Sequence, residues 1–177
     1  MKKTMPTSIN RKLWHNGPNY TADSVIISPI AQKILLIKRS SGEWALPGGF
    51  VNPEEDSFTA AIREAKEETG TIISDNPILI YKGLVNDPRN SQASWIETSA
   101  YLFIVNELSE VSGRDDTIDA AWLPLNNLPK LYASHDEIVA RAIDYLSCLS
   151  LIKMTEFSEN YRNINGGHMQ YDKIIAT

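Results

Sequence analysis

Three glutamates, Glu64, Glu67 and Glu68, lie close together in a segment whose pattern predicts a helix over residues 57–69. Their i, i+3, i+4 spacing places the carboxylates on one patch, where each like-charge pair destabilises an exposed helix by roughly 0.2–0.5 kcal/mol. The patch falls in the last turns, where the helix dipole favours cations. A bound hard cation would explain this arrangement, since Mg²⁺ takes oxygen ligands from carboxylates, waters and substrate phosphates. The alternative is an ordinary solvated acidic face.

The residues before and after this helix support a phosphate site. Leu46-Pro47-Gly48-Gly49-Phe50 precedes the helix, and paired glycines let a backbone approach a ligand closely. Gly70 follows the helix as a stop signal. The predicted buried face consists of apolar residues at helical spacing, namely Phe58, Ala61, Ile62 and Ala65.

The complete string runs from Gly49 through five residues to Glu55, then seven residues to Arg63-Glu64-Ala65, one residue to Glu67-Glu68 and one more to Gly70. This string resembles the signature of the Nudix hydrolases. The one departure is Thr71, which stands where the family prefers an aliphatic residue. The resemblance implies an α/β fold, a Nudix α/β/α sandwich with a mixed central sheet. It also implies hydrolysis of a pyrophosphate bond with Mg²⁺ as cofactor, or Mn²⁺ in its place.

The resemblance also implies roles for individual residues. Glu64 and Glu68 are expected to be metal ligands, Glu67 a third or water-mediated ligand, and the carbonyl of Gly48 a further one. Arg63 is expected to be held by Glu55 or Glu67 and to brace the loop against the helix, so Glu55 and Arg63 join the catalytic group. The general base stays open among these candidates: Glu67, Glu68, Glu97, Asp115 and Asp116.

Segments outside the signature resemble the mitochondrial ADP-ribose pyrophosphatase branch of the family, which includes the Nudix-like domain of an ADP-ribose-gated cation channel. They are Gly17–Asp23, Gly42–Ala45, Asp87–Asn90 with Trp95–Thr98, and Leu131–His135. This resemblance implies ADP-ribose as the substrate. The expected substrate-binding residues are Asn19, Gly48, Gly49, Asp87, Arg89 and Tyr132, with Asp23 a weaker candidate.

The residue types agree with that substrate. Arg89 can hold a phosphate or ribose through its planar fork, Asp87 can accept hydrogen bonds from ribose hydroxyls, and Tyr132 can stack on adenine. Other interpretations remain open. The string Asp87-Pro88-Arg89-Asn90 is also typical of a β-turn, and Tyr132 is also typical of a half-buried packing residue.

The remaining pattern predicts one domain over residues 1–177, with a core at about 14–152 and a polar extension at 153–177. A second helix is expected over 135–152, with Ser134 and Glu137 as a capping box. Strands are expected at 24–28, 33–38, 78–84, 95–105 and 120–124.

Composition limits the class of protein. The net charge of −5 and pI of about 5.2 argue against a nucleic-acid partner. No apolar run reaches membrane-spanning length, and no secretory signal is seen. A single cysteine, Cys148, excludes an internal disulfide. We therefore expect a cytoplasmic protein, a monomer or homodimer, whose partner is a small-molecule nucleotide. Alternatives are a Nudix hydrolase for another nucleoside diphosphate derivative, a non-catalytic ADP-ribose-binding module, and a Nudix-based transcription regulator.

Overall fold

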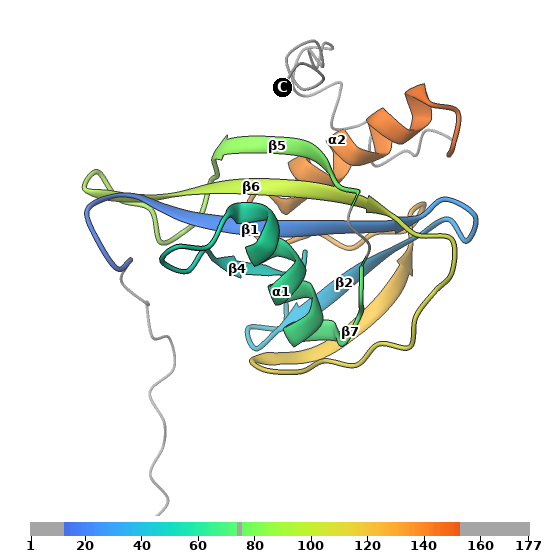
Figure 1. Ribbon diagram of the computed structural model, residues 1–177, viewed down its shortest axis with the longest axis horizontal. Coiled ribbons are helices and arrows are strands. Elements are labelled where there is room, and N and C mark those ends of the chain that lie inside the picture. Colours follow the sequence, from blue (N-terminus) through green and yellow to red (C-terminus); the bar gives the residue numbers. More distant parts are fainter. Residues whose placement is uncertain (1–12, 74–75, 153–177) are drawn as a thin grey trace, which may run out of the picture.

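A long central strand, β1 (Gly17–Ser28), organises the computed structural model, which describes residues 13–73 and 76–152 (Figure 1). The main sheet path has the order β3-β2-β1-β6-β5, while β4 also pairs with β1 and β7 with β2. The pairing of β1 with β6 is parallel, and the other pairings between the named strands are antiparallel. The expected mixed sheet is therefore confirmed. The other elements are β2 (Lys33–Arg39), β3 (Trp44–Ala45), β4 (Gly48–Phe50), α1 (Ser57–Thr69), β5 (Ile78–Leu84), β6 (Ser94–Ile104), β7 (Thr117–Pro124) and α2 (His135–Cys148).

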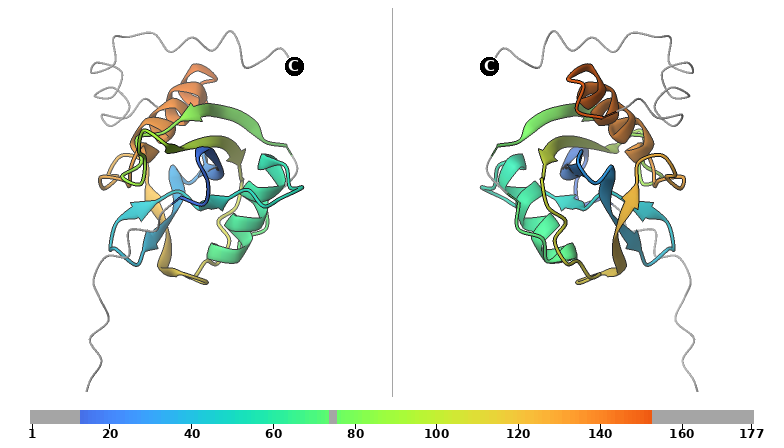
Figure 2. Two further views of the ribbon diagram at one scale, coloured as in Figure 1. Left: turned by 90° about the vertical axis from the view of Figure 1, so that its left-hand side faces the viewer. Right: turned by 90° about the vertical axis from the view of Figure 1, so that its right-hand side faces the viewer.

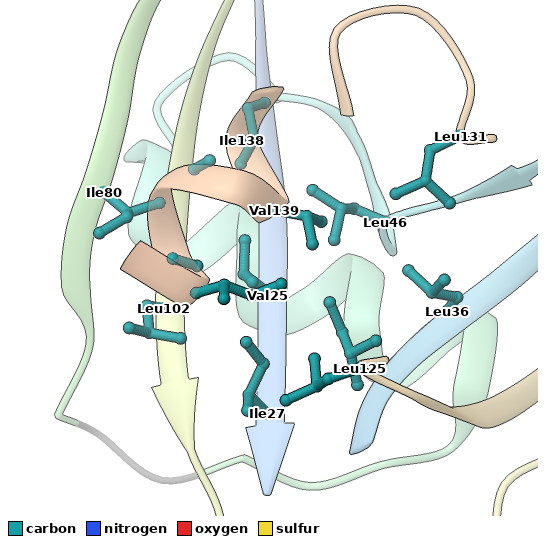
Figure 3. Close-up of a cluster of buried hydrophobic side chains, with 14 of the residues drawn as sticks. Val25, Ile27, Leu36, Leu46, Ile80, Leu102, Leu125, Leu131, Ile138 and Val139 are labelled. Atoms are coloured by element: carbon teal, nitrogen blue, oxygen red, sulfur yellow. The ribbon is translucent and has the colours of Figure 1, made fainter. Parts of the chain in front are cut away.

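The two helices cover opposite faces of the sheet (Figure 2). Successive residues of β1 point to opposite faces. Val25 and Ile27 join the core cluster that contains the apolar residues of α2, whereas Ile26 joins the cluster under α1. Figure 3 shows Val25 close to Val139 of α2, and Ile27 further along the strand beside Leu125. Because both faces are buried here, residues 25–27 of the strand are all apolar, and the predicted sandwich is confirmed.

Local signals determine both ends of α1, and its predicted bounds are confirmed. Asp56 caps the first turn, because its Oδ1 accepts the Thr59 N–H at 2.8 Å. Gly70 adopts a left-handed φ of 76° and donates its N–H to the Lys66 carbonyl at 2.9 Å. No acidic residue stands in the first turn of α1. Its glutamates are therefore concentrated at the end where the dipole opposes them.

The end of α2 differs from the prediction, since the helix stops at Cys148 rather than at Ile152. Ser150 adopts a left-handed φ of 58°. Its N–H bonds to the Ser147 carbonyl, and the next N–H bonds to the Leu146 carbonyl at 3.0 Å. This is a Schellman termination built on serine instead of glycine.

The predicted capping box at the start of α2 is wrong. The Ser134 hydroxyl makes no cap bond within the helix. It accepts the Asn86 N–H at 2.7 Å, and so it ties α2 to a distant loop. Glu137 pairs with Arg141 instead, at 2.8 Å.

Two of the expected strands are longer than predicted, and two short strands were not expected. β1 begins at Gly17 and β7 at Thr117, because pairing with β6 and β2 extends them beyond their apolar stretches. β3 and β4 are two and three residues long, too short to show an alternating pattern. No helix in the described residues is long and apolar enough to cross a membrane. The extension at 153–177 lies outside the described residues.

Candidate active site

The glycine loop packs directly against the acidic end of α1. β4 pairs antiparallel with β1, so that Gly48 lies opposite Asp23. A Cβ atom on Gly48 would collide with Asp23 Oδ1 and, at 2.5 Å, with the Ala22 carbonyl oxygen. A Cβ on Gly49 would collide with the Glu64 carboxylate. Both glycines are therefore needed for close approach, and the loop lies against the carboxylates that the sequence singled out.

Glu68 is a buried carboxylate, with 5% of its surface exposed. Its Oε2 accepts the Gly48 N–H at 2.9 Å. Burial raises the pKa of Glu68 to about 8, with the nearby charges of Glu64, Asp116 and Asp23 adding to the effect against the Gly48 hydrogen bond. The pKa of Glu64 is also raised, again mainly by burial. The raised pKa of both Glu64 and Glu68 indicates that the protein itself does not supply enough positive charge nearby to stabilise both carboxylates in their ionised form.

Arg63 links the loop to the helix, as predicted, and it does so with both expected partners. Its Nε and Nη2 bind the two oxygens of Glu55 at 2.8 and 2.9 Å. Its Nη1 donates to Glu64 at 2.7 Å and to Glu67 at 3.1 Å. Its Nη2 also donates to the Phe50 carbonyl at 3.1 Å. One guanidinium thus fixes the loop, the segment leading to α1, and Glu64.

A divalent cation fits Glu64 and Glu68 better than it fits all three glutamates. Within residues 13–73 and 76–152, no group of three or more acidic, histidine or cysteine side chains is arranged to hold a metal ion. The Glu67 side chain is half exposed and turned toward Arg63. Mg²⁺ commonly uses only one or two protein carboxylates and completes its shell with water and substrate phosphate. Glu64 and Glu68, which both lie against the glycine loop, offer two such carboxylates. Metal ligation by Glu64, Glu67, Glu68 and the Gly48 carbonyl stays a prediction.

We predict that Arg63→Lys lowers both stability and activity. Lysine has no planar fork, so it cannot serve Glu55 and Glu64 together. The free energy of unfolding is expected to fall by about 2 kcal/mol, which is a Tm decrease of about 4–8 °C for a domain of this size. The kcat with Mg²⁺ is expected to fall as well, since Glu64 loses its orienting partner. Thermal unfolding in chelator and steady-state assays measure the two effects. Arg141→Lys, which alters an ion pair on α2, is the matched control, and equal losses in both variants would contradict this role for Arg63.

The loop over residues 112–117 closes the C-terminal end of α1. The Arg114 N–H donates to the Glu68 carbonyl at 3.0 Å. A Cβ on Gly70 would come within 2.7 Å of the Arg114 guanidinium carbon. The loop therefore packs on the helix end and satisfies a carbonyl that the helix itself cannot.

Candidates for the general base lie in two places. Asp115 and Asp116 are carried by the 112–117 loop and are close enough to affect the acidic pair electrostatically, adding to the effect of burial on Glu64 and Glu68 respectively. Glu97, on β6, accepts the Trp95 indole N–H at 2.9 Å. That bond gives Glu97 a structural partner.

A second cluster joins Asp87, Arg89 and Tyr132. Arg89 binds Asp87 with two parallel hydrogen bonds of 2.8 Å, and the Tyr132 hydroxyl donates to Asp87 at 3.2 Å. Burial alone would raise the pKa of Asp87, but the Arg89 bonds hold it below its usual value. The segment is also the β-turn that its sequence suggested, since the Asn90 N–H bonds to the Asp87 carbonyl at 3.0 Å. The turn holds the cluster in place.

Aromatic and cationic side chains extend this cluster toward the glycine loop. The guanidinium of Arg39 lies over the Tyr132 ring, 4.2 Å from its centroid. The guanidinium of Arg89 lies 5.5 Å from the centroid of the Phe50 ring, and Phe50 directly follows Gly49. The two clusters are thus neighbours. The sequence did not single out Arg39 or Phe50 as site residues, because an isolated arginine or phenylalanine shows no pattern of its own.

Asn19, the remaining predicted substrate-binding residue, is 1% exposed. Its Oδ1 accepts the Trp14 N–H at 3.1 Å, and its Nδ2 donates to the His15 and Gly17 carbonyls. Its side chain is therefore engaged in holding the turn that precedes β1. The structure does not bring this amide together with Asp87 and Arg89.

His135 lies between the glycine loop and the Asp87–Arg89–Tyr132 cluster and contacts both. Its Nδ1 accepts the Leu46 N–H at 2.9 Å, and its Nε2 lies 3.9 Å from Asp23 Oδ1. Burial lowers the pKa of His135 despite the nearby Asp23 carboxylate. A neutral imidazole thus supports the loop.

Comparisons with known proteins agree with this geometry. A NUDIX domain model matches residues 19–142. The mitochondrial ADP-ribose pyrophosphatase of Rattus norvegicus is 31% identical over 164 residues, covering 70% of this chain and 47% of that protein. The ADP-ribose pyrophosphatase of Methanocaldococcus jannaschii is 41% identical over 113 residues, covering 60% and 63%. The chain thus spans roughly half to two-thirds of these relatives.

Among solved structures, a MutT/nudix family protein from Enterococcus faecalis superposes with a TM-score of 0.64 at 26% identity, covering 82% of this chain and 66% of that one. The domain match includes the whole glycine loop, α1 and the Asp87–Tyr132 cluster. The fold, the acidic helix and the sequence match lead to one conclusion: the chain belongs to the Nudix hydrolase family.

Proposed function

We propose that this Nudix hydrolase cleaves the pyrophosphate bond of ADP-ribose, giving AMP and ribose 5-phosphate, with Mg²⁺ or Mn²⁺ as cofactor. One observation carries the proposal. The buried carboxylate of Glu68 and the partly buried carboxylate of Glu64 lie against Gly48 and Gly49, and the Asp87–Arg89–Tyr132 cluster reaches the same loop through Phe50. A metal–diphosphate site and a site for ribose or phosphate are therefore adjacent. The two ADP-ribose pyrophosphatases among the relatives add support for the substrate.

Different residues of the site have different roles in the proposed reaction. Glu64 and Glu68 hold the divalent cation, which when bound neutralises phosphate charge and lowers the pKa of a water. Arg63 keeps Glu64 in position through the bonds described above. Arg89 binds a phosphate or ribose oxygen while Asp87 fixes its orientation. The proton of the attacking water passes to a carboxylate of the site. The candidates for this acceptor are Glu67, Glu68 and the two aspartates of the 112–117 loop, Asp115 and Asp116.

A substrate panel tests the proposal. Purified protein with Mg²⁺ is incubated with ADP-ribose, NADH, a nucleotide sugar and an oxidised nucleoside triphosphate, and products are separated by chromatography. We expect ADP-ribose to be the best substrate, with AMP and ribose 5-phosphate as equimolar products. Faster turnover of another compound would show that the protein hydrolyses a pyrophosphate bond in a different substrate. Calorimetric binding of ADP-ribose without AMP release, in excess Mg²⁺ or Mn²⁺, would make the protein a sensor.

We predict that Arg89→Lys weakens the Michaelis complex. The lysine keeps a positive charge but cannot pair with both Asp87 oxygens, so the cation is no longer held in one orientation. The KM for ADP-ribose is expected to rise about tenfold or more, with a smaller change in kcat. Arg141→Lys again serves as the matched control. An unchanged KM would show that Arg89 acts only within the turn.

A further inference from the structure

A cavity beside the glycine loop has no assigned role. Its volume is about 400 Å³, and it lies between the turn that precedes β1 and the loop that leads from β4 to α1. Figure 1 shows these two segments on the same side of the molecule. Three aromatic side chains, Trp14, Tyr20 and Phe50, form part of its lining. A concave, aromatic-lined space next to a catalytic site is a common form of ligand subsite.

The rings of this cavity are arranged as an open platform. Trp14 stacks on Phe50 with centroids 4.8 Å apart and an angle of 26° between the ring planes. Trp14 nonetheless keeps 67% of its surface exposed, and Tyr20 keeps 56%. Two large exposed aromatic residues that line one cavity indicate a binding surface rather than ordinary packing.

Three polar residues of the cavity, Glu55, Asn19 and His15, are already bound to other groups of the protein. Glu55 uses both carboxylate oxygens on Arg63. The Asn19 amide bonds to backbone groups, and His15 Nε2 lies 3.0 Å from the Pro18 carbonyl oxygen. What the cavity offers a ligand is therefore ring surface. A flat aromatic group fits this surface, because every aromatic base has a face that can stack.

The cavity also lies next to the reacting groups. The Phe50 carbonyl accepts a hydrogen bond from Arg63, which also holds Glu64. Arg89 lies over the Phe50 ring. A diphosphate held by a cation at Glu64 and by Arg89 would therefore have the cavity within reach of one of its substituents.

Tyr132, the residue expected to stack on adenine, is less available. Arg39 lies over its ring at 4.2 Å. The His135 ring meets it at 90°, with centroids 5.9 Å apart. Its hydroxyl is bound to Asp87. Tyr132 is therefore already packed against groups of the protein, in contrast to Trp14 and Tyr20.

We propose that the nucleobase of the substrate binds in this cavity, stacked on Trp14 and Tyr20, and not on Tyr132. The proposal rests on the proposed function, in that the substrate is a nucleoside diphosphate derivative. In this arrangement the nucleobase is recognised by stacking on the aromatic rings. The site then accepts purines with little regard to their hydrogen-bonding edges.

Product binding tests this assignment without turnover. Isothermal titration in Mg²⁺ measures Kd for AMP, which carries the base, and for ribose 5-phosphate, which does not. Trp14→Ala and Tyr20→Ala are each expected to weaken AMP binding roughly tenfold, as for loss of a base-stacking ring, and to leave ribose 5-phosphate binding unchanged. Trp14→Phe, which keeps a ring, is expected to restore most of the AMP affinity.

The outcomes separate this inference from the proposed function. If wild-type protein hydrolyses ADP-ribose but both alanine variants bind AMP normally, the nucleobase lies elsewhere and only the inference fails. Weakened AMP binding in Tyr132→Leu alone would place the base on Tyr132 and overturn it. If the panel identifies a different nucleotide substrate, its nucleoside monophosphate replaces AMP, and the same losses are expected. A strong preference for adenine over hypoxanthine in the ADP-ribose analogue would contradict recognition by stacking.

Discussion

Glu64→Gln and Glu68→Gln are each expected to lower kcat by about a thousandfold in saturating Mg²⁺, with the fold intact. Glutamine has nearly the same shape as glutamate but no charge, so it is a much weaker ligand for a hard cation. The Gly48 N–H can still donate to the amide oxygen at position 68, and the loop therefore keeps its anchor. Steady-state rates of AMP release from ADP-ribose, with circular dichroism for the fold, measure the effect.

Glu107→Gln is the matched control, since Glu107 is an exposed residue of the segment between β6 and β7. It is expected to leave kcat unchanged. Near-normal kcat in both Glu64→Gln and Glu68→Gln would refute the metal-assisted mechanism. Loss in only one of them would mean that a single carboxylate carries the cation.

The same Glu68→Gln variant is expected to be more stable than the wild type when metal is removed. In chelator, the buried Glu68 carboxylate has a pKa of about 8, mainly because burial disfavours its charge. An unfolded chain would hold this group near pKa 4.5. Between these values the folded state binds a proton that the unfolded state has lost, so wild-type stability falls as pH rises from about 4.5 to 8. The neutral glutamine avoids this loss.

We expect a Tm advantage of several degrees for Glu68→Gln at pH 8 in EDTA, corresponding to a few kcal/mol. The advantage should shrink toward zero near pH 5. Adding Mg²⁺ should stabilise the wild type, because the ion binds only the folded state, and should do less for the variant. Differential scanning fluorimetry across pH measures both effects. A variant less stable than wild type at every pH would show that the buried charge is already compensated by the protein.

What could be predicted from the sequence was largely what local patterns encode. The bounds of α1 follow from its apolar face and from Gly70, and both act within a few residues of the helix. The spacing of Glu64, Glu67 and Glu68 identified the acidic patch in the same way, and the resemblance to the Nudix signature singled out Glu64 and Glu68 within it. The end of α2 could not be foreseen, because Ser150 adopts a conformation usually given to glycine.

Contacts between distant segments could not be predicted. Ser134 looked like a helix cap, but its hydroxyl is taken by the Asn86 N–H, a partner that only the folded chain brings close. The stacking of Arg39 on Tyr132 and of Trp14 on Phe50 also joins separate segments. The hydrogen bonds by which the Asn19 side chain holds the turn before β1 could not be read from its segment either, and its role in substrate binding stays a prediction.

The parallel pairing of β1 with β6 has a consequence for how the protein is made. β1 carries the pairing that holds the glycine loop, yet its parallel partner begins only at Ser94, far along the chain. Non-local pairing of this kind slows folding, to about milliseconds to seconds for comparable topologies. On the ribosome, where chains grow by about 5–20 residues per second, the loop and α1 emerge seconds before β6 does. During that interval α1 can pack only on strands β1 to β4, so the sheet beneath the acidic helix is completed only after β6 has emerged.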